Sequence, residues 1–122
     1  MSAETKLFIV LDDEQSIRQS IASFLEDEGH TVLRAESSEA AIELVKEQPV
    51  DAAVVDIRLP GKDGNYFMLE ATKLRSGIKF VVHTGSADYS PPEEVRALGI
   101  TREKVLIKPG RDLNMILEAL KH

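Results

Sequence analysis

The fold is decided by the stretch LFIVLDD at residues 7–13, in which five apolar residues run directly into two acids. Three further runs of this kind each end on a polar residue: AAVV before Asp56, FVVH before Thr84 and VLI before Lys108. Short apolar runs that alternate with helix-like segments are typical of parallel strands buried on both faces. The pattern predicts an open α/β sheet whose carboxyl edge carries these polar residues, at the place where such sheets hold ligands.

Helices are predicted between these strands from the spacing of apolar residues and from the turn residues that end each segment. The longer predicted helices cover about residues 14–28, 38–48, 65–75 and 113–120. A shorter helix is expected to start with Ser90 as N-cap, Pro91 in the first helical position and Glu93 completing a capping box. The alternation is (βα)₅, and right-handed crossovers make it a doubly wound α/β sheet.

Length and composition restrict the kind of protein. The 122 residues suit a single domain over 1–122, with its core at about 6–120. Lys and Arg number 15 against 21 Asp and Glu, and the net charge of −6 argues against direct binding to nucleic acid or an anionic membrane. There is no cysteine, which excludes thiol chemistry and thiolate metal sites. Without a membrane-length apolar stretch or a signal-peptide pattern, a cytoplasmic location is the default expectation.

The polar residues at the strand ends share one chemistry. Three carboxylates (Asp12, Asp13 and Asp56), the hydroxyl of Thr84 and the amine of Lys108 suit a divalent cation together with a phosphoryl group. Each motif alone has a plainer interpretation, since an Asp pair after a strand usually caps a helix, and a lone polar residue at a strand end usually belongs to a loop. Their common position at one edge of one sheet favours a shared site.

In this combination the sequence resembles the receiver domain of two-component response regulators, over about residues 6–120. The matching features are Asp12-Asp13, Asp56 with Leu59-Pro60 and Asp63-Gly64 after it, Thr84-Gly85 and Lys108-Pro109. The resemblance implies a flavodoxin-like fold with a five-stranded parallel sheet in the order 2-1-3-4-5. Strands 1 and 3 are then neighbours about 4.8 Å apart, and Lys108 is roughly 10 Å from Asp56 at the backbone, a gap that a long amine crosses.

The resemblance implies a role for each acid. Asp56 is the expected phosphoacceptor, whose carboxylate attacks phosphorus and becomes an acyl phosphate. Mg²⁺ is the expected cofactor, with Asp12, Asp13, Asp56 and the backbone carbonyl of Arg58 as its ligands. Asp13 is the more direct ligand in this interpretation, and Asp12 acts partly through water.

Two further residues are expected to contact the phosphoryl group. Lys108 pairs with one phosphoryl oxygen and Thr84 hydrogen-bonds another, so the site works by positioning and electrostatics. The bond between Lys108 and Pro109 resembles a family position that is commonly cis, which would aim the lysine inward. The only expected catalysis is the domain's own phosphorylation and dephosphorylation.

The expected function is that of a signalling receiver. The phosphoryl donor is a sensor histidine kinase, a phosphotransfer protein or a small phosphodonor. The face formed by strands and helices 4 and 5 is expected to carry the change to an output domain, a downstream protein or a second copy of the chain. Two alternatives stay open: a Mg²⁺-dependent aspartyl-phosphate phosphohydrolase, which Arg58 disfavours because such enzymes place a second acid there, and a phosphate sink without output.

Position 105 departs from the family pattern. Receiver domains usually carry Tyr or Phe three residues before the lysine, where the ring changes rotamer as the threonine moves, but this chain has Val105. Valine is short and stiff at χ1, so it is poorly suited to report such a movement. We hypothesise that the loop at residues 85–90 is the mobile element, ordered by the phosphoryl group instead.

Overall fold

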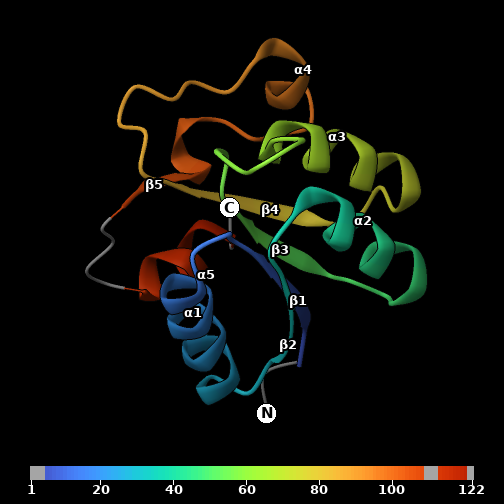
Figure 1. The fold of residues 1–122 in the computed structure, drawn as a ribbon, viewed down its shortest axis with the longest axis vertical. Coiled ribbons are helices and arrows are strands. Elements are labelled where there is room, and N and C mark those ends of the chain that lie inside the picture. Colours follow the sequence, from blue (N-terminus) through green and yellow to red (C-terminus); the bar gives the residue numbers. More distant parts are fainter. Residues whose placement is uncertain (1–4, 109–112, 121–122) are drawn as a thin grey trace.

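A parallel sheet forms the centre of the molecule (Figure 1). The computed structural model describes residues 5–108 and 113–120, and within them five strands pair in the order β2-β1-β3-β4-β5. The predicted strand order and the (βα)₅ alternation are therefore confirmed. The strands are β1 (Leu7–Leu11), β2 (Thr31–Ala35), β3 (Ala52–Val55), β4 (Lys79–Thr84) and β5 (Val105–Ile107).

Helices cover both faces of this sheet (Figure 1). They are α1 (Gln15–Asp27), α2 (Ser38–Glu47), α3 (Gly64–Leu74), α4 (Glu93–Arg96) and α5 (Asn114–Leu120), with a 3-10 turn at Arg102–Lys104. Along β1, Ile9 and Leu11 join the core cluster beneath α2, α3 and α4, whereas Phe8 and Val10 join the one beneath α1 and α5. Both faces of the strand are thus buried, which explains why its run is apolar throughout. Among the described residues, no helix combines the length and apolar character needed to cross a bilayer.

Helix boundaries follow the prediction where a local cap sets them. The Ser37 hydroxyl accepts a hydrogen bond from the backbone N–H of Ala40, so Ser37 is the N-cap of α2. The Asp63 carboxylate does the same for Tyr66 at the start of α3. Gly29 ends α1 with a φ of 95°, a conformation that glycine adopts without strain.

The predicted start of α4 is wrong. The helix begins at Glu93, with Pro92 as N-cap and without a side-chain capping bond, so Ser90 does not cap it. The reason is local: a residue that precedes proline is disfavoured in the α region, and Pro91 precedes Pro92. As a result α4 is only one turn long, and residues 85–92 form a long loop between β4 and α4.

Candidate functional site

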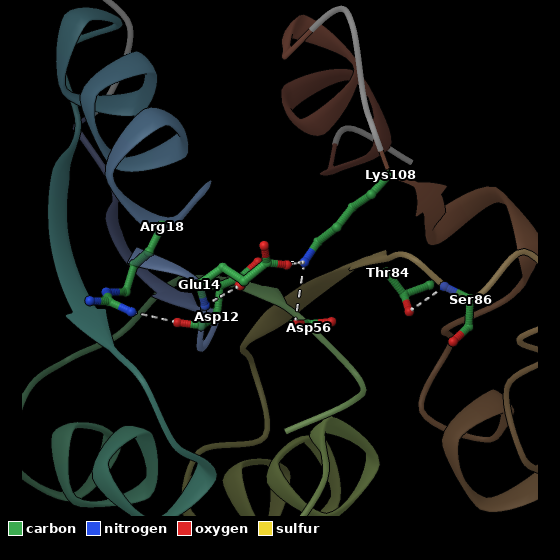
Figure 2. Close-up of polar contacts among 7 residues, drawn as sticks. All are labelled: Asp12, Glu14, Arg18, Asp56, Thr84, Ser86 and Lys108. Atoms are coloured by element: carbon green, nitrogen blue, oxygen red, sulfur yellow. Dashed lines mark hydrogen bonds and ion pairs between the residues drawn. The ribbon is translucent and has the colours of Figure 1, made fainter. Parts of the chain in front are cut away.

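The carboxyl edge of the sheet brings predicted site residues together, and Figure 2 shows Asp12, Asp56 and Lys108 converging there. Leu11 of β1 is in register with Val55 of β3, so the residues that follow them, Asp12 and Asp56, are neighbours. The Asp56 N–H donates to the Leu11 carbonyl at 2.9 Å, which continues the pairing to the site. Carboxylate oxygens of Asp12, Asp13 and Asp56 lie within 4.8 Å of one another. The predicted convergence of the three acids is confirmed, while their roles stay predictions.

Lys108 reaches into this cluster from the end of β5. Its Nζ lies 2.9 Å from Asp12 Oδ2, 3.3 Å from Asp56 Oδ2 and 3.6 Å from Glu14 Oε1. Partial burial alone would lower the pKa of Lys108, but its hydrogen bond to Asp12 and the charges of Asp12 and Asp56 outweigh that effect and raise the pKa. The lysine is therefore a firmly charged group held by the acids of the site.

Asp56 is the acid whose ionisation is most perturbed. Its side chain is buried, at 5% exposure, and burial together with the negative charge of Asp12 raises the pKa of Asp56 to about 6, against the opposing effect of Lys108. The carboxylate is thus still mostly ionised at neutral pH, as a nucleophile must be. The carboxylates of the site repel one another, and Lys108 offsets this repulsion only in part. Such a cluster of oxygen ligands fits a hard divalent cation, because the positive charge of the ion removes the remaining repulsion.

Asp12 and Asp13, the two acids after β1, differ in their contacts with the rest of the protein. The Glu14 N–H donates to Asp12 Oδ1 at 2.9 Å, Lys108 pairs with Oδ2, and Arg18 Nη1 donates to the Asp12 carbonyl at 2.8 Å. Asp13, in contrast, is exposed and lines a cleft of about 690 Å³. This difference supports Asp13 as the more accessible ligand for a cation.

Thr84 is the last residue of β4, on the strand between those that lead to Asp56 and Lys108. It is fully buried, and its Oγ1 accepts a hydrogen bond from the Ser86 N–H at 3.2 Å. Figure 2 shows this bond directed into the loop after β4. The hydroxyl predicted to meet a phosphoryl oxygen is therefore engaged by that loop.

The cleft beside the acids is formed by the loops that follow β1, β3 and β4. Arg58, Pro60, Ser86 and Tyr89 are among its lining residues. Asp63, the N-cap of α3, also lines the cleft, and at the next residue, Gly64, a Cβ would overlap the carbonyl oxygen of Asp56 and the side chain of Val55. Glycine is therefore needed at position 64 for α3 to begin this close to Asp56 and the end of β3.

His83, the residue before Thr84, is packed in the interior. Side chains along β4 point alternately to the two faces of the sheet, and that of His83 lies on the face covered by α1 and α5. The residue is 5% exposed. Within residues 5–108 and 113–120, neither of its ring nitrogens has a hydrogen-bond partner. Burial, followed by the nearby charge of Lys108, lowers the pKa of His83, so the ring is neutral. Pro109 lies outside the described residues, and its expected cis bond stays a prediction.

Sequence reasoning missed three residues that hold the site. Glu14 is the third acid in a row, and its position indicates only the start of a helix, whereas in the structure it pairs with Lys108. Arg18 and Ser86 had no signal in the sequence, because an arginine in a helix and a serine in a loop are common surface residues. Their contacts depend on how α1 and the loop after β4 fold back toward the sheet edge.

Comparison with known proteins agrees with this geometry. The chain matches the family described as the response regulator receiver domain over residues 8–121. It is 38% identical over 116 residues to the transcriptional regulatory protein AruR of Pseudomonas aeruginosa, which covers 91% of this chain and 46% of AruR. The chain spans about half the length of the curated relatives it matches.

Solved structures of response regulators share the fold. The response regulator TrrA of Thermotoga maritima, in complex with Mg²⁺-BeF, has a TM-score of 0.82 and 25% identity, covering 96% of this chain and 97% of that one. A response regulator of Burkholderia pseudomallei with a phosphorylated aspartic acid, calcium ion and citrate has a TM-score of 0.83 and 26% identity, covering 94% and 66%. Because the family match spans nearly the whole chain and the fold agrees with it, this chain belongs to the receiver-domain family of two-component response regulators, which are signalling modules.

Proposed function

We propose that this chain is a phosphoryl-accepting receiver in which Asp56 is the phosphoacceptor. The observation that carries the proposal is the contact of a buried, perturbed Asp56 with Lys108, inside a cluster completed by Asp12 and Asp13. A carboxylate nucleophile, a fixed cation and two further oxygen ligands are the parts that phosphoryl transfer by positioning requires. The whole chain, with its core at residues 6–120, acts as one receiver domain.

The transfer step uses residues in the places described above. A carboxylate oxygen of Asp56 attacks the phosphorus of a phosphohistidine, an O–P bond forms as the P–N bond breaks, and the departing imidazole takes up a proton. Lys108 then exchanges its ion pair with Asp12 for one with a phosphoryl oxygen, and Thr84 turns its hydroxyl to another. The charge of Lys108 offsets the negative charge that the phosphoryl group brings to the sheet edge.

Mg²⁺ is the proposed cofactor. Asp13 and Asp56 would hold it directly, Asp12 partly through water, and the carbonyl of Arg58 would add an oxygen. When bound, the ion supplies neutralisation of the phosphoryl oxygens and of the acid cluster. The carboxylate donor set supports this assignment, as does the likeness to TrrA, whose structure contains Mg²⁺-BeF.

Membership of the receiver-domain family supports a proposal for the donor and the output. A sensor histidine kinase or a phosphotransfer protein supplies the phosphoryl group in the cytoplasm. The face formed by β4, α4, β5 and α5 then carries the change to an output domain, a downstream protein or a second copy of the chain. In support of an output, the relative AruR is a transcriptional regulatory protein, and the match covers 46% of its length.

Incubation with acetyl phosphate and Mg²⁺, followed by intact mass measurement, tests the proposal. One phosphoryl group is expected on the wild type and on Asp27→Asn, a matched change at an exposed acid at the end of α1. None is expected on Asp56→Asn, nor on the wild type in EDTA. Modification of Asp56→Asn would reject the assigned acceptor, and sustained hydrolysis of a phosphate ester would favour a phosphohydrolase instead.

A further inference from the structure

A side-chain hydrogen bond ties the loop after β4 to α3. The Tyr89 hydroxyl donates to Asn65 Oδ1 at 2.7 Å, and its half-buried ring packs against the core cluster beneath α3 and α4. Burial, with the charge of Asp63 as a second cause, raises the pKa of Tyr89 to about 12, so the phenol keeps the proton that it donates. Tyr89 therefore anchors the middle of residues 85–92 to the first turn of a helix that begins beside the phosphoacceptor.

This anchor is the last link in a series of contacts that starts at the site. Thr84 Oγ1 accepts a hydrogen bond from the Ser86 N–H at 3.2 Å. The Ser86 carbonyl in turn accepts one from the Tyr89 N–H at 3.0 Å, which closes a tight turn. The turn thus connects the residue bonded to Thr84 directly with the backbone of Tyr89.

Position 105 offers no alternative connection of this kind. Val105 is the first residue of β5 and only partly buried, and its short side chain carries neither a ring nor a hydrogen-bonding group. Tyr89 is the aromatic residue of the loop itself, at the wall of the cleft that borders the acids. It thus has the size, the polar group and the position that Val105 lacks.

We propose that Tyr89, through its hydrogen bond to Asn65, is the aromatic residue that couples the state of Thr84 to the rest of this receiver. The inference rests on the proposed phosphorylation of Asp56. When Thr84 rotates about χ1 to bring its hydroxyl to a phosphoryl oxygen, Oγ1 moves away from the Ser86 N–H, which loses its acceptor, so that the turn opens and the Tyr89–Asn65 bond breaks. The intact bond, conversely, favours the unphosphorylated arrangement, as linkage between the two events requires.

The rate of phosphorylation by acetyl phosphate tests this coupling. Tyr89→Phe keeps the ring and removes only the donor, and Asn65→Ala removes the acceptor. Each is expected to raise the rate roughly twofold to tenfold, the range that loss of one hydrogen bond implies. The double variant should be no faster than either single variant, because both remove the same bond. Tyr66→Phe, at the other tyrosine of the chain, should match the wild type.

The rates also separate coupling from a structural role. Unchanged rates in Tyr89→Phe and Asn65→Ala, with a lower melting temperature, would make the contact purely structural and overturn the inference. Fully additive effects in the double variant would also overturn it, because two residues that act through one shared bond are not additive.

A spectroscopic test follows Tyr89 directly. The chain has no tryptophan and two tyrosines, so Tyr66→Phe leaves Tyr89 as its single fluorophore. Beryllofluoride with Mg²⁺ should change the emission of this variant and increase its quenching by acrylamide, whereas adding Asp56→Asn should abolish both changes. Constant emission in a variant that acetyl phosphate modifies fully would overturn the inference and leave the proposed function standing. Absence of any added phosphoryl by mass would overturn the proposed function and the inference with it.

Discussion

Asp56 is both buried and ionised, and the free-energy cost of burying its charge explains why it needs a cation as a neighbour. Its carboxylate is removed from water beside Asp12, another buried acid, and Lys108 is the one cation that reaches both within the described chain. A buried charge needs such a partner, because desolvation and like-charge repulsion otherwise outweigh its interactions. The compensation is only partial, because burial and the charge of Asp12 still raise the pKa of Asp56 to about 6 despite Lys108.

Replacement of Asp56 by Asn should stabilise the metal-free domain at neutral pH, by on the order of 1–3 kcal/mol. The folded pKa of about 6 exceeds the ordinary value of 3.8, so the stabilising contribution of Asp56 is complete below pH 3.8 and is lost as the pH rises through about 6. The advantage of Asp56→Asn should therefore grow over that interval and stay level above it. Urea unfolding in EDTA across this range measures it, and an advantage independent of pH would contradict the raised pKa.

Gly64 is the residue whose lack of a side chain the site requires. Gly64→Ala should destabilise the domain by about 1–3 kcal/mol, because its Cβ would overlap the Asp56 carbonyl oxygen. It should also slow phosphorylation by displacing Asp56. Gly77→Ala is the matched control, since a Cβ there meets open space, and it should change stability by no more than about 0.5 kcal/mol. Urea unfolding and intact mass report the two effects, and equal stability in both variants would contradict the close approach.

At the scale of the element, β4 shows how one strand serves the core and the site at once. Phe80 and Val82 pack beneath α2, α3 and α4, whereas Val81 packs beneath α1 and α5. His83 follows on the same side as Val81, where a polar ring is buried without a partner among the described residues. The strand then ends on Thr84, whose hydroxyl is held by the loop that follows. The end of β4 thus places an unpartnered ring in the core and a hydrogen-bonded hydroxyl at the edge of the sheet.

His83→Leu should stabilise the domain by about 1–2 kcal/mol, because it removes a buried donor and acceptor that lack partners. His30 is the matched comparison, since its Nδ1 accepts a hydrogen bond from the Lys6 N–H at 3.1 Å. His30→Leu should therefore destabilise the domain. Chemical denaturation of both variants gives the sign directly, and a destabilised His83→Leu variant would show that the ring has a partner.

At the scale of the whole molecule, strand order decides where the chemistry occurs. From β1 the chain passes to β2 on one side, and from β3 it passes to β4 and β5 on the other. The boundary between β1 and β3 is therefore the switch point, where open α/β sheets bind ligands. Asp12, Asp13 and Asp56 lie at that boundary, and Lys108 reaches it from β5 at the edge of the sheet. The fold thereby brings three acids together at one point of a chain with net charge −6, where they repel one another.

Mg²⁺ should stabilise the folded domain by mass action, by about 2.7 kcal/mol at a hundredfold excess over its dissociation constant. EDTA should reverse the effect. Asp13→Asn should remove most of it, whereas Asp88→Asn, at an exposed acid of the same cleft outside the cluster, should retain it. Thermal denaturation over a magnesium titration measures the shift, and an undiminished shift in Asp13→Asn would exclude that residue as a ligand.

The sequence by itself determined the fold class, the strand-end position of the acids and the approximate ends of the longer helices. These are local properties, since apolar period, capping residues and turn residues act within a few positions of the chain. The strand order came from the resemblance to receiver domains, and the structure confirms it. The one wrong boundary, at α4, also had a local cause, because Pro92 restricts Pro91.

Only the tertiary structure decided which groups the site residues meet. It pairs Lys108 with both Asp12 and Asp56, holds the Thr84 hydroxyl on Ser86, and joins Tyr89 to Asn65 across 24 positions of sequence. No periodicity encodes such contacts, because they depend on how loops after different strands fold over a common edge. Strand ends are set by neighbouring residues, whereas hydrogen bonds between loops are set by the packing of the whole domain.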